Sequence, residues 1–153
     1  MKTFIWLLML TFFLVPVTLL AQTDDQMQII RDAAKVNKKL IISDNMNLTE
    51  EEAKNFWPVY DEYQKALSTL YERTGKAIKS YAENYNALSD EDAKTILEES
   101  IAIQEDILKL RRSLLPNFNK VLPAKKVALY YQIENKLDAI LKYELARGIP
   151  LVK

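Results

Sequence analysis

Few residues of this chain have the types and spacing that catalysis requires. Lys109 and Ser113 stand one helical turn apart, a spacing at which a lysine amine could activate a serine hydroxyl as a nucleophile. The chain has only two glycines, and no glycine-rich turn supplies backbone donors for an oxyanion hole beside this pair. No glycine-rich phosphate-binding loop occurs either. The Ser–Lys spacing therefore does not indicate an enzyme.

Two acidic runs, Glu50–Glu52 and Asp90–Asp92, are candidates for weak binding of a hard cation. Each run also stands at a predicted helix start, where acidic side chains favour the positive end of the helix dipole. A carboxylate-bridged metal pair in a helical bundle uses Glu-x-x-His on two helices, and this chain has no His. The absence of Cys excludes disulfides, thiolate zinc sites and cysteine nucleophiles. We therefore expect no enzymatic activity, no cofactor and no metal site.

The first 21 residues have the pattern of a secretory signal. Lys2 is followed by an apolar stretch over residues 4–20, and Ala21 is a small residue before a possible cleavage site at Gln22. This pattern predicts export to the periplasm, with residues 22–153 as a single all-helical domain. The alternative is an uncleaved signal, which would be the chain's one contact with a membrane.

Hydrophobic periodicity near 3.5 residues predicts four helices after the signal. The first covers about residues 24–42 and ends before the polar residues at 44–47. The second begins at a capping box formed by Thr49 and Glu52, and continues to about residue 87. We call the row of residues that each helix is expected to turn toward the interior its seam. The predicted seam of the first helix is Met27, Ile30, Ala34, Asn37 and Ile41, and that of the second is Phe56, Tyr60, Tyr63, Leu67, Leu70, Thr74, Ile78, Tyr81 and Tyr85.

The third helix is predicted to begin after Ser89, and the fourth at Leu122-Pro123, where proline suits the first turn. Their seams are Ala93, Ile96, Ser100, Ile103, Ile107, Leu110 and Leu114, then Val127, Tyr130, Ile133, Leu137, Ile140 and Glu144. Short connections make consecutive helices antiparallel, and Pro58 and Pro116 are expected to bend theirs. The sequence therefore predicts an all-α fold with a long, kinked, antiparallel helical hairpin. Hairpins of this length expose much surface, which pairing of two copies would cover.

Basic residues gather between positions 107 and 133, although the chain as a whole has 21 basic and 21 acidic residues. This stretch contains no acidic residue and six basic ones: Lys109, Arg111, Arg112, Lys120, Lys125 and Lys126. One interpretation is compensation within the fold, with Glu50–Glu52 beside Arg111 and Arg112. The other is a basic patch that receives acidic client proteins or anionic headgroups. Nucleic acid is not an expected partner, because the chain is neutral and exported.

Aromatic residues are numerous, with eight Tyr, five Phe and two Trp. Those on the seams are expected in the core, whereas Trp57, Tyr71, Tyr131 and Tyr143 fall outside the strict seams. Their large apolar area and polar tip suit either protein contacts or core and dimer packing. The candidate client or partner contacts are Trp57, Tyr71, Arg111, Arg112, Lys125, Lys126 and Tyr131.

Two helix starts carry related segments, Leu48-Thr49-Glu50-Glu51-Glu52 and Leu122-Pro123-Ala124-Lys125-Lys126. In an exported, all-helical chain without Cys, they resemble the Spy/CpxP-like periplasmic proteins, whose signature is a twice-occurring Leu-Thr-x-x-Gln. Glu52 and Lys126 stand where that signature has Gln, and Pro123 where it has Thr. The matching positions are Leu48, Thr49, Glu52, Leu122, Pro123 and Lys126.

The resemblance implies a kinked, antiparallel helical dimer shaped as a shallow cradle, acting as an ATP-independent chaperone or envelope-stress modulator. Some relatives are linked to zinc through His, which this chain lacks. We therefore expect an exported homodimer that binds unfolded or envelope proteins. The alternatives are a structural or adaptor protein with one specific protein partner, and a weak carboxylate metal binder.

Overall fold

A computed structural model describes residues 37–153, and all regular structure in this range is helical. A helical segment over residues 37–46 is followed by α2 (Glu50–Asn84), α3 (Asp90–Val121) and α4 (Ala124–Gly148). The prediction of an all-α fold with four helices is confirmed. The predicted signal at residues 1–21 and the first-helix seam positions Met27, Ile30 and Ala34 lie outside the described residues.

Two of the helix starts have the caps that the sequence predicts. The Thr49 hydroxyl accepts a hydrogen bond from the Glu52 amide at 3.2 Å, and the Glu52 carboxylate accepts one from the Thr49 amide at 2.8 Å. This reciprocal capping box satisfies two of the amides left free at the start of α2. Ser89 caps α3 by accepting from the Asp92 amide at 3.1 Å.

The first helix ends later than predicted. Helix continues to residue 46, because Asn45 stays helical by donating its side-chain amide to the Ile41 carbonyl at 2.8 Å. Asn47, with φ of 44°, then ends the segment in the left-handed conformation that Asn tolerates. The predicted seam position Ile41 is 40% exposed, and Ile42 is the buried residue instead.

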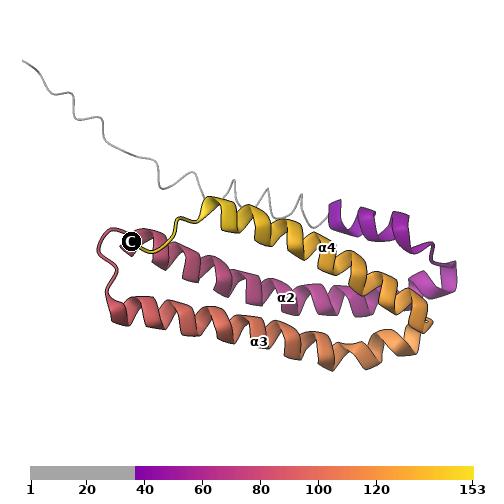
Figure 1. Ribbon diagram of the computed structural model, residues 1–153. Helices are drawn as coiled ribbons and strands as arrows, with labels where there is room; N and C mark the ends of the chain where they lie inside the picture. The colour runs from indigo at the N-terminus through magenta and orange to yellow at the C-terminus, as the bar shows by residue number, and fades with distance from the viewer. Residues whose placement is uncertain (1–36) are drawn as a thin grey trace, which may run out of the picture. The chain divides into compact units, whose positions relative to one another are not determined.

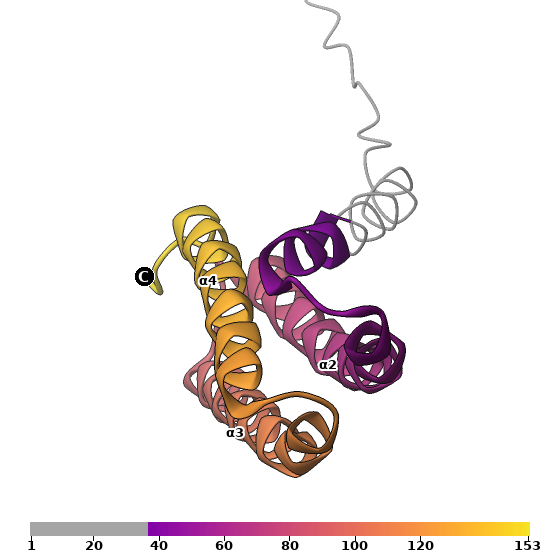
Figure 2. The same cartoon turned by 90° about the vertical axis from the view of Figure 1, so that its right-hand side faces the viewer.

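α2 and α3 form the predicted antiparallel hairpin and lie side by side along their length, as Figure 1 shows. α4 returns along the hairpin, and the segment 37–46 lies on the opposite side of the bundle from α3 (Figures 1 and 2). Pro58 lies inside α2 and Pro116 inside α3, where each removes a backbone hydrogen bond and favours a bend.

The hydrophobic core occupies one end of the bundle, where α2 begins and α3 turns into α4. Its centre is a group of fully buried rings, with Phe118 and Tyr130 at 4.8 Å and Phe56 and Tyr130 at 5.3 Å between centroids. Such aromatic pairs add about 0.5–1.5 kcal/mol each beyond the burial of their area. The clustered buried residues are Ile42, Met46, Phe56, Tyr60, Tyr63, Leu67, Leu114, Phe118, Leu122, Val127, Tyr130 and Ile133.

The predicted seams are buried mainly at this end, although Ile103 of α3, which is 3% exposed, is also buried. Beyond Leu67, the α2 seam positions are half-buried, and Ile140 of α4 is 62% exposed although it was expected in the core. On α4, Glu134 is buried, and its carboxylate is bonded to Lys38 at 2.8 Å and to Gln64 at 3.1 Å. The expectation of a continuous apolar seam is therefore wrong for the other half of the bundle.

Candidate functional site

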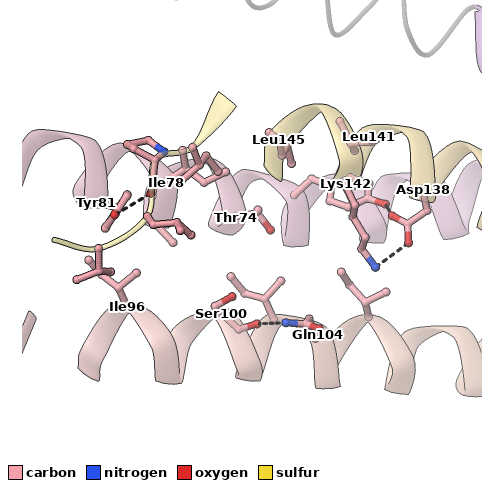
Figure 3. Close-up of a pocket in the computed structure, with 18 residues that line it drawn as sticks. Thr74, Ile78, Tyr81, Ile96, Ser100, Gln104, Asp138, Leu141, Lys142 and Leu145 are labelled. Carbon is pink, nitrogen blue, oxygen red and sulfur yellow. Dashed lines mark hydrogen bonds and ion pairs between the residues drawn. The ribbon is translucent and has the colours of Figure 1, made fainter. Parts of the chain in front are cut away.

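A groove of about 530 Å³ lies in the loosely packed half of the bundle, between α2, α3 and α4 (Figure 3). Its volume is within the range of roughly 300–1,000 Å³ that is typical of ligand sites. Most of its lining is aliphatic, and the three helices all contribute to it. The aliphatic lining residues of these helices are Ala77, Ile78, Ile96, Ile103, Ile107, Leu141 and Leu145.

The groove exists because small side chains occupy seam positions here. Thr74 and Ala77 of α2 and Ser100 of α3 line it, whereas the corresponding interior at the other end of the bundle is filled by Phe and Tyr rings. These small side chains leave the interior at this end incompletely filled, so the space between the three helices stays open. Figure 3 shows Thr74 above and Ser100 below this space.

One polar cluster lies at the inner end of the groove. Asp138 accepts a hydrogen bond from the Tyr71 hydroxyl at 2.8 Å and pairs with Lys142 at 3.0 Å and with Arg111 at 3.5 Å. Burial raises the pKa of Asp138, but hydrogen bonds from Lys142 and Tyr71 outweigh burial and hold that pKa below its ordinary value. Burial and the Asp138 hydrogen bond both raise the pKa of Tyr71. Asp138 is therefore ionised and Tyr71 neutral at pH 7, and neither is poised to transfer a proton.

The C-terminal residues of the chain lie at the mouth of the groove. Tyr81 donates its hydroxyl to the Pro150 carbonyl at 2.9 Å (Figure 3), and Lys153 donates to the Asn86 side chain at 2.9 Å. Ile149 has an extended backbone, and the residues that line the groove run to Val152. The apolar residues Ile149, Pro150, Leu151 and Val152 thus line the groove, although Leu151 stays 87% exposed.

The structure brings three of the predicted contact residues, Tyr71, Arg111 and Tyr131, together in one network of internal hydrogen bonds. Arg111 donates to the Tyr63 hydroxyl at 3.2 Å and to Asn135 at 3.2 Å, in addition to its pair with Asp138. Tyr131 donates its hydroxyl to the Arg111 carbonyl at 3.1 Å. Of the seven candidates, Tyr71 alone lines the groove.

The other four candidates lie away from the groove. Trp57 is half-buried against Tyr60, with their ring centroids at 5.3 Å and the Lys39 ammonium 4.8 Å from the Trp57 ring. Lys126 is bonded internally, whereas Arg112 and Lys125 are exposed. Tyr143, which was also outside the predicted seams, is 63% exposed.

The basic stretch is compensated in part within the fold, but by other pairs than predicted. Glu52 binds Lys126 at 2.5 Å rather than Arg111 or Arg112, because α4 and not α3 brings its first turn to the start of α2. The hydrogen bond from Lys126, together with that from the Thr49 amide, lowers the pKa of Glu52. This pair also joins the two motif-like segments, with Leu122 buried and Leu48 half-buried beside it and Pro123 at the start of α4.

Sequence reasoning did not find the groove. It placed Ile78 and Ile96 in a packed core, where aliphatic residues with this spacing usually lie, but both are only half-buried. The sequence does contain one indication of the groove, which is the small polar residue at the seam positions Thr74 and Ser100. Neither side chain is large enough to fill the space between helices.

No group of three or more metal-ligating side chains lies together within residues 37–153. No helix in this described range is sufficiently long and apolar to span a bilayer. Comparison with known proteins found no matching family model, no similar curated protein and no similar solved structure.

Proposed function

We propose that this chain is an exported protein that binds apolar segments of other polypeptides, with chaperone-like activity that needs no nucleotide. The observation that carries the proposal is the open groove, lined by Ile and Leu side chains of three helices. The role agrees with the one that the resemblance to Spy/CpxP-like proteins implies.

The chemistry of the groove supports an apolar ligand of variable sequence. Its charged groups, Asp138 and Lys142, are already bonded to each other, so they offer little to fix one polar ligand in one orientation. A ligand held by aliphatic contacts alone would bind through many weak interactions, which favours tolerance of sequence over tight affinity.

The C-terminal residues support a polypeptide as that ligand. The sequence Ile149-Pro150-Leu151-Val152 is apolar and its first residue is extended, and it lies where a client chain would enter. A segment of an unfolding protein presents the same chemistry, since its apolar side chains and its backbone are exposed together.

The experiment is suppression of aggregation of two unrelated unfolding proteins, measured by light scattering without nucleotide. Ala77→Phe places a ring in the groove, whereas the matched variant Ala82→Phe adds the same ring at an exposed position of α2 that does not line it. We expect the wild-type protein and Ala82→Phe to suppress aggregation and Ala77→Phe to lose most of that activity.

Three outcomes would contradict the proposal. Equal activity of the two variants would show that clients bind elsewhere. Failure of the wild-type protein on both clients would favour the adaptor with one specific partner. Calorimetric uptake of zinc or calcium at micromolar concentration would instead favour the carboxylate metal binder.

A further inference from the structure

We propose that residues 149–153, the strap, compete with clients for the groove: the strap occupies the mouth of the groove and must be displaced before an apolar polypeptide binds there. The inference rests on the proposed function, because it concerns the regulation of the same groove. Three features of the strap carry it, namely its path, the weakness of its attachment and its chemistry.

The local sequence directs the strap away from α4 and toward the groove. The Ile149 amide donates to the Leu145 carbonyl at 3.0 Å, which closes the last turn of the helix. Pro150 restricts the residue before it to extended conformations, and Ile149 accordingly has φ of −96° and ψ of 118°. The chain beyond α4 then lines the groove between α2 and α3, beside Tyr81, as Figure 3 shows.

Two contacts hold the strap in place. The Tyr81 hydroxyl of α2 donates to the Pro150 carbonyl at 2.9 Å. At the other end of the strap, the Lys153 ammonium donates to the Asn86 side chain at 2.9 Å and lies 4.5 Å from the centroid of the Tyr85 ring. Both hydrogen bonds are exposed to solvent, so water can replace either of them when the strap leaves.

The strap buries little of its own apolar surface. Leu151 is 87% exposed and Val152 is 65% exposed, although both line the groove. A leucine of the core is very different, since Leu122 is only 4% exposed. Displacement of the strap therefore returns little buried apolar area to water, and the strap has the properties of a removable occupant.

The chemistry of the strap is that of the proposed client. Ile149, Pro150, Leu151 and Val152 form an apolar segment with an extended start, and the Tyr81 hydroxyl that binds the Pro150 carbonyl can donate equally to a backbone carbonyl of another polypeptide. A client chain and the strap would thus use the same apolar surface and the same hydrogen-bond donor.

The attachment of the strap to α4 makes this competition effective. A segment joined to its site by a short connection has a local concentration on the order of millimolar, so weak contacts are sufficient. A client that binds only the open form has its apparent affinity reduced in proportion to the fraction of molecules in which the strap is displaced. The strap therefore sets the affinity that a client must exceed.

The absence of Cys from the chain allows the strap to be locked and released in the same molecule. In Asn86→Cys/Lys153→Cys, the two thiols replace side chains that are hydrogen-bonded to each other, and a short bismaleimide with a reducible disulfide joins them. The probe is fluorescein-labelled, carboxymethylated lactalbumin, which stays unfolded, and its binding is measured by fluorescence anisotropy. We expect the linked protein to bind the probe about tenfold more weakly than the same protein after reduction of the linker.

The matched control carries the same linker away from the strap. Ser80→Cys/Asn84→Cys joins two exposed positions one turn apart on α2, neither of which lines the groove. Reduction of this linker should leave the affinity for the probe unchanged.

Removal of one hydroxyl tests the anchor without a linker. Tyr81→Phe keeps the ring that lines the groove but removes the hydrogen bond to Pro150, so we expect the probe to bind up to about fivefold more tightly. Tyr143→Phe, at a residue of α4 that is 63% exposed and outside the groove, is the control. A fluorophore on Leu151→Cys should in addition become more mobile when unlabelled lactalbumin is added.

Three results would overturn the inference and leave the proposed function intact. These are equal binding of the probe by the linked and reduced proteins, weaker binding by Tyr81→Phe than by Tyr143→Phe, and a fluorophore at position 151 whose mobility does not change on binding. If neither the linked nor the reduced protein nor Tyr81→Phe binds the probe, the proposed function fails, and the inference fails with it.

Discussion

The buried carboxylate of Glu134 allows a quantitative test of how the segment 37–46 is held to the bundle. Glu134 is 1% exposed and accepts hydrogen bonds from Lys38 and from Gln64, so it links that segment to α2 and α4. The two charges are not equivalent, because the Lys38 side chain is 19% exposed and its Glu134 partner 2%. Replacement of Lys38 and replacement of Glu134 should therefore lower the free energy of unfolding by different amounts.

Lys38→Met keeps the aliphatic stem but leaves a buried carboxylate with an amide as its remaining partner. Removal of one partner from a buried pair typically costs about 3–5 kcal/mol, and we expect the lower end, about 3 kcal/mol, because water reaches the lysine. Glu134→Met should cost less, since Lys38 can turn its ammonium to solvent. With a urea dependence of about 1.5 kcal/mol per molar, Lys38→Met should lower the unfolding midpoint by about 2 M.

The assay is urea unfolding followed by circular dichroism at one protein concentration. The double variant Lys38→Met/Glu134→Met should be more stable than Lys38→Met alone, because it leaves neither charge unpaired in the interior. A double variant that loses as much as the sum of the single variants would refute this reasoning, because the two residues would then contribute independently.

Three further predictions concern single positions. Phe118→Ala should lower the free energy of unfolding by about 3–5 kcal/mol, whereas Ile140→Ala, at a residue 62% exposed, should change it by less than about 0.5 kcal/mol, both measured in urea. Gly75→Ala should raise the free energy of unfolding by about 0.5–1 kcal/mol and increase the melting temperature, because the site is inside α2 and a Cβ there meets nothing within 4 Å. Asp138→Asn should destabilise the protein at pH 7. Because the folded-state pKa of Asp138 is lowered from 3.8, its contribution is complete above that pH and is lost as the pH falls through the folded-state pKa. The difference in the free energy of unfolding between the wild type and Asp138→Asn should therefore become smaller in unfolding curves recorded below pH 3.8.

Local signals were sufficient for the helices and their starts. The capping box at Thr49 and Glu52 and the cap at Ser89 depend on residues three positions apart, so the sequence contains all the information that they need. The hairpin of α2 and α3 follows from two long helices and a short connection. The end of the first helix was missed because Asn45 can either break a helix or, as here, bond back to the preceding turn.

The interior could not be derived in the same way. Periodicity identifies the face of a helix that turns inward, but it does not show whether the facing side chains fill the space between helices. Tyr63 and Thr74 both occupy predicted inward positions, yet one lies in the core and the other beside the groove. The ion-pair partners of Lys126 and Arg111 could not be predicted from the sequence either, because they depend on how α4 is placed along the hairpin.

The uneven distribution of rings along the bundle has a consequence for motion. Cooperative unfolding requires the aromatic end to open, whereas the other end can separate while those rings stay packed. Amide hydrogens near Phe56 and Phe118 should then exchange only through global opening. Those near Ile78 and Ile96 should exchange through local fluctuations, at rates that depend little on added denaturant. Such a gradient would let one end of the molecule adapt its width to what it holds, while the other end preserves the fold.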